Sequence, residues 1–342
     1  MSGYISLRRN YSRAPAPGFS LIELMIAMLL GLIVIAGVFS VFLAGQQTYR
    51  TNSALGDIQD SSRIAFEMVA RDVRDAGLTA CGNKNRIANV LNNKDTAWYA
   101  NWANALHGYE GTDPAVTTGT GEGQRVTGTD SVQVLSAGGM GLSVADTPSG
   151  PAANFKLNES TNDLQSGDMI IVCDPDHAAM VQITKQNNSN VVLVHNTGNT
   201  VSPGNCSKGL GFPTICDSNA NGNPYTFSKN SQIAKLTGSD WYIGNNPANG
   251  RSLYRVVLVT NAAGAVSTTA QEMIRNVTDM QIKYLQPPSA AFVPADQVTD
   301  WSIVNAVQIE LTVESTSQSA GTDAKPLSRT FASTTTVRNR VL

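Results

Sequence analysis

The sequence predicts an α+β protein: one long N-terminal helix, first transmembrane and then amphipathic, followed by a domain of antiparallel β-strands. An apolar run that begins at Phe19 and ends near Gly45 carries one charged residue, Glu23. A stripe of apolar residues at helical spacing continues this run to about Ala76. Beyond residue 79, short strand-like segments alternate with polar loops, and no helical stripe lies between them.

We expect four segments along the chain. Residues 1–18 form a leader peptide, 19–45 a transmembrane helix, 46–78 an amphipathic continuation of that helix, and 79–342 an antiparallel β domain. The leader carries three arginines and no acidic residue. By the positive-inside rule, the leader stays in the cytoplasm and the β domain is exported. The sequence therefore predicts a single-pass protein of the inner membrane with its C-terminal domain in the periplasm.

The N-terminal motif differs from an ordinary secretory signal, which is cleaved after its apolar run. Here the distinctive small residue, Gly18, precedes a run of about 27 residues that is long enough to span a bilayer. The string Gly-Phe-Ser-Leu-Ile-Glu at 18–23 resembles the class III signal of type IV prepilins and pseudopilins. The resemblance implies cleavage between Gly18 and Phe19 by the prepilin peptidase, N-methylation of Phe19, and a part for Glu23 in assembly. A plain signal anchor is the alternative.

The helix is expected to continue past the membrane because one apolar stripe runs along it at spacings of seven, four, four and three residues: Ile58, Ala65, Val69, Val73 and Ala76. No proline occurs between Phe19 and Pro114, so nothing in the sequence forces a kink. A single helix from Phe19 to Ala76 would be roughly 85 Å long. Two helices broken near 45–47 are the alternative, and Gly77 or Gly82 is the expected end.

The β domain is predicted from segments rich in β-branched residues, several of which alternate between apolar and polar positions. This pattern is typical of half-buried antiparallel strands and disfavours a doubly wound α/β domain. The predicted strands are 131–136, 168–173, 180–184, 191–195, 232–236, 253–260, 277–285, 304–313 and 329–337.

Composition and motifs give no indication of catalysis or of nucleic-acid binding. The formal net charge is -2 and 15% of residues are charged, so the chain lacks the basic character of a nucleic-acid-binding domain. The histidines are scattered (His107, His177 and His195), and no catalytic motif is present. We interpret 174–177 as a turn and the glycine-rich segment 119–123 as a flexible loop. We therefore expect no enzyme activity, no cofactor and no specific nucleic-acid partner.

One segment resembles part of a calcium-binding loop. Asp217, Asn219 and Asn221 place oxygen-bearing side chains at alternate positions, and Gly222 is sixth. The twelfth position is Ser228 rather than the glutamate that such a loop requires. These residues are weak metal candidates, and we favour a turn.

The four cysteines lie in the part of the chain that is expected to be exported, which predicts disulfide bonds. Four cysteines allow three pairings. Cys206 and Cys216 bracket a short loop, whose closure is entropically favoured. Cys81 and Cys173 would then join the end of the helix to a strand.

Several segments resemble the PilW-type minor pilins of the type IV pilus, which are related to the J-type minor pseudopilins of type II secretion. The matching segments are 63–77 with Cys81 and Gly82, 167–174, 181–184, 277–284, Trp301, 304–309 and 329–340. The resemblance implies a tip or priming complex that initiates pilus assembly and supports adhesion and twitching motility. It implies other minor pilins, the major pilin and the inner-membrane assembly platform as partners, and a place at the pilus tip after assembly. The alternatives are a J-type pseudopilin that primes a secretion pseudopilus, and a tip adhesin or DNA-binding subunit.

Overall fold

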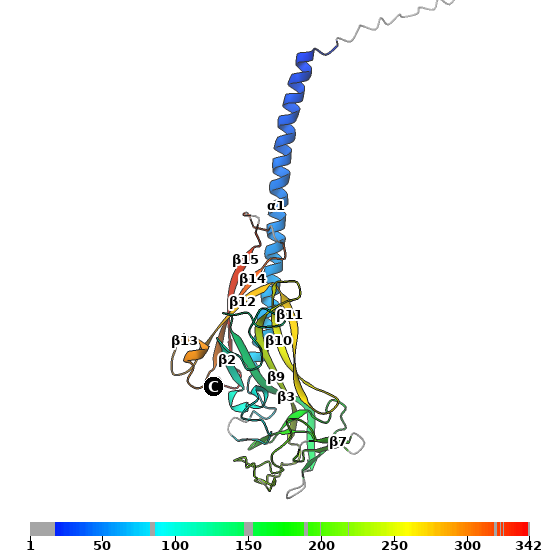
Figure 1. Ribbon diagram of the computed structural model, residues 1–342, viewed down its shortest axis with the longest axis vertical. Helices are drawn as coiled ribbons and strands as arrows, with labels where there is room; N and C mark the ends of the chain where they lie inside the picture. The colour runs from blue at the N-terminus through cyan, green and yellow to red at the C-terminus, as the bar shows by residue number, and fades with distance from the viewer. Residues whose placement is uncertain are drawn as a thin grey trace, which may run out of the picture. The chain divides into compact units, whose positions relative to one another are not determined.

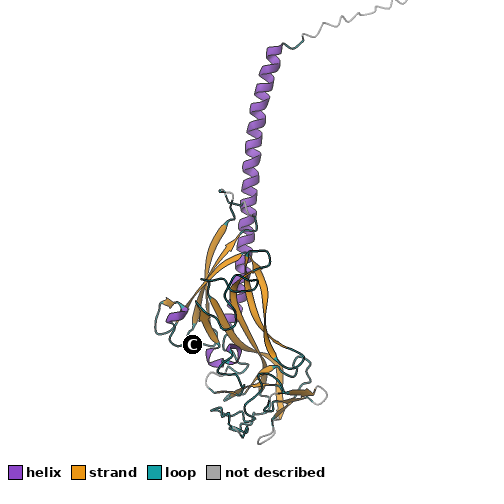
Figure 2. Ribbon diagram, viewed as in Figure 1, coloured by secondary structure: helices purple, strands orange, loops and turns teal. Residues whose placement is uncertain are grey.

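The computed structural model describes residues 18–82, 86–146, 153–187, 191–198, 200–217, 219–317, 320–321, 323 and 325–340. The chain divides into two compact units, one up to Ser53 and one from Ala54 onward. Each unit is described by itself. Figure 1 colours the chain by residue number, and Figure 2 colours it by secondary structure.

The helix α1 (Leu21–Arg74) is continuous over 54 residues. The alternative of two helices broken near 45–47 is therefore wrong, and the single long helix is confirmed. In the first unit its apolar side chains are exposed, among them Phe39 and Phe42. Among the described residues, α1 is the one helix whose length and apolar composition suit it to cross a membrane.

In the second unit, the predicted apolar stripe of α1 is buried. Ile58, Ala65, Val69 and Val73 belong to a core cluster that includes residues of both sheets of the domain. The helix ends at Arg74, and Gly77 follows with a φ of +68°, a conformation that favours glycine. The Gly77 N–H then donates a 2.8 Å hydrogen bond to the carbonyl of Leu135. The chain thus leaves the helix directly against the sheet.

An eleven-stranded sheet makes up most of the β domain, with the strand order β1-β6-β5-β9-β3-β4-β8-β7. Strand β2 pairs with β3, and the β10–β11 hairpin is joined to β9. All these pairs are antiparallel except β1 with β6. The bounds are β1 (Ile87–Asn89), β2 (Leu106–Tyr109), β3 (Ser131–Asp146), β4 (Asn154–Leu157), β5 (Met169–Cys173), β6 (Ala178–Gln182), β7 (Lys185–Asn187), β8 (Val192–Val194), β9 (Gln232–Asn245), β10 (Arg251–Thr260) and β11 (Val266–Arg275).

A four-stranded antiparallel sheet completes the domain, in the order β13-β12-β14-β15. Its strands are β12 (Val277–Leu285), β13 (Phe292–Val293), β14 (Ala306–Glu314) and β15 (Ser328–Thr336). In the connections that the structure describes there are three short 3-10 helices: Trp98–Ala100, Trp102–Asn104 and Ala295–Gln297. The α+β architecture, a long helix followed by a mostly antiparallel β domain, is confirmed (Figure 2).

Each of the nine predicted strands overlaps an observed one, but the observed sheets contain more strands and longer ones than predicted. Strands β3 and β9 extend to Asp146 and Asn245, well beyond the predicted ends at 136 and 236. Strand β11 was not predicted because residues 267–271 are all exposed and show no apolar alternation. Strands β1, β2, β4, β7 and β13 were also missed, each with four residues or fewer.

Candidate functional site

The N-terminal motif forms a capping box at the start of α1. The Ser20 N–H and Oγ each donate to Glu23 Oε2 at 3.0 Å, and the Glu23 N–H donates to Ser20 Oγ at 3.3 Å. This reciprocal pattern satisfies donors that a helix start otherwise leaves unpaired. The capping box was not predicted, although Ser-x-x-Glu before an apolar run is its sequence signature.

The capping box leaves half of the Glu23 carboxylate available. Within the described residues, Glu23 Oε1 accepts no hydrogen bond. Phe19, next to the cap, is 90% exposed, and a Cβ on Gly18 would meet no atom within 4 Å. The arginines of the leader lie outside the described residues. The expected cleavage point is therefore unobstructed in the described part of the motif, and Glu23 retains one oxygen for a further donor.

The part of α1 in the first unit presents an apolar surface around its whole circumference. Leu21, Ile33, Val41 and Phe42 are each more than 60% exposed. A helix that is apolar all round is stable only when lipid or other protein chains cover it. The length and the exposed apolar surface of this part of α1 thus fit a membrane anchor.

The carboxylate of Asp72 links the last turn of α1 to the larger sheet through hydrogen bonds and an ion pair. Asp72 Oδ2 accepts hydrogen bonds from Trp241 Nε1 at 2.7 Å and Ser239 Oγ at 2.8 Å. Arg255 completes the contact with an ion pair of 3.0 Å, and its guanidinium lies 5.4 Å from the centre of the Trp241 ring. Strands β9 and β10 supply these partners, so a single helical residue joins α1 to two neighbouring strands.

The structure contains two disulfide bonds, Cys81–Cys173 and Cys206–Cys216, with Cα–Cα distances of 5.9 and 5.1 Å. In the sequence, Cys81–Cys173 was the pair that remained after loop closure favoured Cys206–Cys216. The first joins the segment after α1 to the end of β5, at a sequence separation of 92. The second closes a local loop. The first bridge therefore restrains the position of the helix end relative to the sheet.

The metal candidates form a turn. Asp217 Oδ1 accepts the N–H of Ala220 at 3.1 Å, and the Asp217 carbonyl accepts the same N–H. Asn219 and Asn221 follow in the same loop. Over the part of the chain that the structure describes, no three potential His, Cys, Asp or Glu ligands come together.

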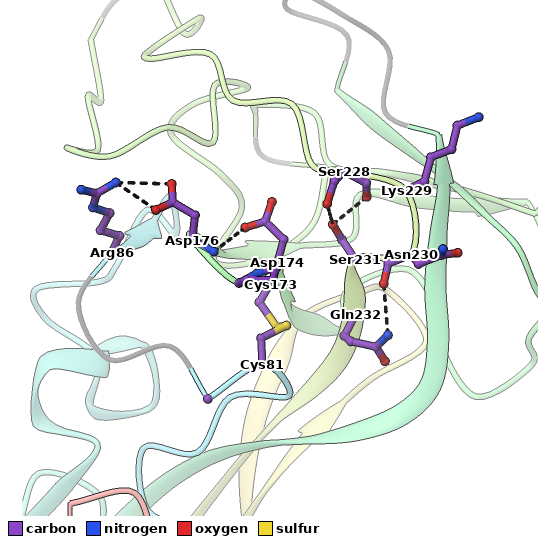
Figure 3. Close-up of a pocket in the computed structure, with 12 residues that line it drawn as sticks. Cys81, Arg86, Cys173, Asp174, Asp176, Ser228, Lys229, Asn230, Ser231 and Gln232 are labelled. Carbon is purple, nitrogen blue, oxygen red and sulfur yellow. Dashed lines mark hydrogen bonds and ion pairs between the residues drawn. A yellow bond between two sulfur atoms is a disulfide. The ribbon is translucent and has the colours of Figure 1, made fainter.

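A pocket of about 940 Å³ lies beside the Cys81–Cys173 disulfide (Figure 3). Arg86 and Asp176 face each other across 3.2 Å at one side of it. Asp174 turns inward, where it accepts the N–H groups of Asp176 and His177 and the hydroxyl of Tyr225. The interpretation of 174–177 as a turn is confirmed, and the lining residues in the described segments include no nucleophile paired with a base.

The three histidines lie apart from one another. His177 hydrogen-bonds the carbonyl of Leu210 at 2.6 Å, and the centre of its ring lies 4.1 Å from that of Tyr225 in a tilted arrangement. His107 is sandwiched between two aromatic rings, and burial lowers its pKa. His195 stacks on Phe155, and burial lowers its pKa to about 4. All three are packed within the β domain as structural residues.

Two family models match the chain. Residues 15–39 match the prokaryotic N-terminal methylation motif. Residues 240–340 match type IV pilus-assembly protein W and span the chain from β9 through β15. No curated protein matches the chain. One match thus contains the capped motif and the start of the apolar helix, and the other contains strands of both sheets, so over these two stretches the chain is similar to type IV pilus-assembly protein W and to proteins with the N-terminal methylation motif.

Proposed function

We propose that this protein is a minor pilin, that it joins a tip complex with other minor pilins, and that it helps to initiate type IV pilus assembly. In this way it would support pilus-dependent adhesion and twitching motility. The observation that carries the proposal is the continuity of α1. The same helix has a fully exposed apolar part and a part that is buried in the β domain through Asp72 and the apolar stripe.

A continuous helix suits a subunit that leaves the membrane for a helical bundle. Each subunit exchanges lipid contacts for contacts with other helices, and the first few subunits lack the neighbours that later ones have. A pre-assembled cluster of minor pilins lowers this nucleation barrier. A structural role of this kind requires no catalytic site, and we propose none.

We infer that processing prepares the subunit for docking. Removal of residues 1–18 by the prepilin peptidase creates an amine at Phe19, which is then methylated. Glu23 pairs with the amine of a mature N-terminus through Oε1, the oxygen that the cap leaves free. The amine belongs either to the same subunit or to the neighbouring subunit. An ionisable residue within a membrane helix usually has such a partner. If one subunit's helix shifted by one turn along its neighbour, the Glu23 carboxylate would lose its partner. The pair therefore also fixes the axial register of the subunits.

The proposed location follows from the topology. The protein is held in the inner membrane with the β domain in the periplasm, and it moves to the pilus tip on assembly. Its partners are then the peptidase, the assembly platform, other minor pilins and the major pilin.

The experiment compares Glu23→Gln with Ser20→Ala. The glutamine retains an oxygen that accepts the capping hydrogen bonds but has no charge, whereas Ser20→Ala weakens the cap by about 1 kcal/mol and keeps the charge. Recovery of other minor pilins from detergent-extracted membranes, with counts of surface pili, is the readout. We expect partner recovery and the number of surface pili to fall in Glu23→Gln and to remain near wild type in Ser20→Ala.

Two results would contradict the proposal. Normal partner recovery and piliation in Glu23→Gln would show that Glu23 serves only to cap the helix. Normal pili with impaired protein secretion after deletion of the gene would instead assign the chain to a secretion pseudopilus.

A further inference from the structure

Two carboxyl groups are buried side by side in the β domain, beneath the loop that connects β2 to β3. Asp113 belongs to this loop and is 5% exposed, and Asp240 belongs to β9 and is fully buried. The Gln133 Nε2 group donates to Asp113 Oδ1 at 2.8 Å and to Asp240 Oδ2 at 3.1 Å. The Ser131 hydroxyl donates to the other oxygen of Asp113. One amide nitrogen therefore bridges the two carboxyl groups.

No cation forms an ion pair with either carboxyl group within the described residues. The charge of Arg125 acts on the pair, but its terminal nitrogens donate to backbone carbonyls of the connection between β2 and β3: Tyr109, Glu110, Gly111 and Thr129. Neither Asp113 nor Asp240 forms a salt bridge in the described part of the chain. Asp240 Oδ1 is fully enclosed and has no donor directed at it.

We propose that the Asp113–Asp240 pair is a proton-binding site, and that the bound proton holds the loop 110–125 against the sheet. Two adjacent buried carboxylates repel each other strongly, and a single proton removes the repulsion. The protonated carboxyl group then donates to the other, a hydrogen bond that two carboxylates cannot form. The proton comes from water, and the pair is left with one negative charge beside the one positive charge of Arg125.

The surroundings of the pair support this assignment. Burial raises the pKa of Asp240 far above its ordinary value, and the charge of Asp113 and a hydrogen bond between the two groups raise it further. Tyr109 from β2, Tyr242 from β9 and Tyr284 from β12 also face the cluster, and burial raises their pKa values, so they remain neutral.

One further carboxylate, Asp130, faces Arg125, and it connects the loop to the smaller sheet. Its Oδ2 accepts the N–H of Ile282 at 2.7 Å, and its N–H donates to the carbonyl of Met280 at 2.8 Å. Glu110, at the other end of the loop, accepts the N–H of Ala295 at 2.8 Å. The loop therefore joins both sheets, and loss of the proton would loosen their junction.

Proton binding makes the folded state dependent on pH. A carboxyl group whose pKa is higher in the folded state stabilises that state most at low pH, and the stabilisation is lost as pH rises towards the folded pKa. Between the ordinary pKa of the carboxyl group and its pKa in the folded state, the folding equilibrium constant falls tenfold per pH unit for one proton.

The test is infrared spectroscopy of the full-length protein in detergent micelles and deuterated buffer at pH 8. Because burial raises the pKa of Asp130 only to about 6, Asp130 is ionised at this pH. We expect wild type to show the C=O band of one protonated carboxyl group. Asp240→Asn, which preserves shape and supplies an N–H donor to Asp113, should lose the band. Asp217→Asn, at an exposed turn, should retain it.

Hydrogen–deuterium exchange of peptides from 110–125 provides the second measurement. After correction for the intrinsic pH dependence, exchange in wild type should increase above the pKa of the pair, and exchange in Asp240→Asn should not. Absence of the carboxyl band in wild type at pH 8 would show that both groups are ionised and would overturn the proposal. Its persistence in Asp240→Asn, or one tightly bound divalent cation per chain by elemental analysis, would also overturn it.

Discussion

Removal of the Asp72 carboxylate should separate the end of α1 from the sheet. In Asp72→Ala the Trp241 N–H and the Ser239 hydroxyl lose their acceptor. Trp241 is 1% exposed and Ser239 is 3% exposed, so water reaches neither donor easily. Each unpaired donor costs about 1–3 kcal/mol.

The ion pair with Arg255 contributes less. The Arg255 side chain is 30% exposed and that of Asp72 is 17% exposed, so after the substitution the guanidinium turns towards water. The charge component is then worth about 1 kcal/mol or less. We therefore expect the free energy of unfolding to fall by about 3–5 kcal/mol in Asp72→Ala. In Asp72→Asn, where a carbonyl oxygen remains as acceptor, it should fall by about 1–2 kcal/mol.

The assay is urea unfolding of the full-length, disulfide-bonded protein in detergent, followed by tryptophan fluorescence. Asp60→Ala, on the exposed face of the same helix, is the matched control and should lie within about 0.5 kcal/mol of wild type. If Asp72→Ala behaves like Asp60→Ala, apolar packing alone holds the helix and the reasoning fails. Equal losses in the alanine and asparagine variants would mean that charge, and not the acceptor, dominates.

Three further effects should be measurable by the same unfolding assay. Gly108→Ala should cost about 1–3 kcal/mol, because the added Cβ would overlap the Tyr284 hydroxyl and ring. Replacement of both cysteines of the Cys81–Cys173 bridge by serine should cost about 4–5 kcal/mol, and loss of the shorter Cys206–Cys216 bridge about 3 kcal/mol, from unfolded-chain entropy. Burial raises the pKa of Asp130 to about 6, so its contribution is present below its ordinary pKa and is lost, by up to about 3 kcal/mol, as pH rises from 4 to 6.

Each of these effects has a control. Gly138→Ala, where a Cβ meets no atom within 4 Å, should change stability far less than Gly108→Ala, and equal effects would contradict the overlap argument. Free thiols at these cysteines in non-reducing peptide maps of the wild-type protein would contradict the disulfide prediction. Asp130→Asn should make the fall in stability between pH 4 and 6 less steep, with the part due to the Asp113–Asp240 pair remaining, and an unchanged slope would show that Asp130 does not contribute to it.

The features that the sequence predicted are those with local signals. The apolar run from Phe19 and the stripe through Val69 and Val73 each lie within one helix, so spacing alone indicates them. The Ser20–Glu23 cap has a local signal too, and a search for capping boxes would have found it.

The features that the sequence analysis missed depend on contacts between distant segments. Asp72 lies beside the apolar stripe, but its role depends on Trp241 in β9, 169 residues away. The Asp113–Asp240 pair is brought together by a strand pairing that no local pattern specifies. Strand β11 was missed for a different reason: residues 267–271 are exposed, so the apolar alternation that marks a strand is absent.

The mass of the mature protein tests the central claim most directly. Full-length protein from the membrane fraction, and protein from sheared pili, would be analysed by intact mass and by sequencing of the N-terminal peptide. We predict a chain that begins at Phe19, carries one methyl group on its terminal nitrogen, and retains the whole of α1. A chain that still carries residues 1–18, or one that begins after Gly45, would contradict the assignment.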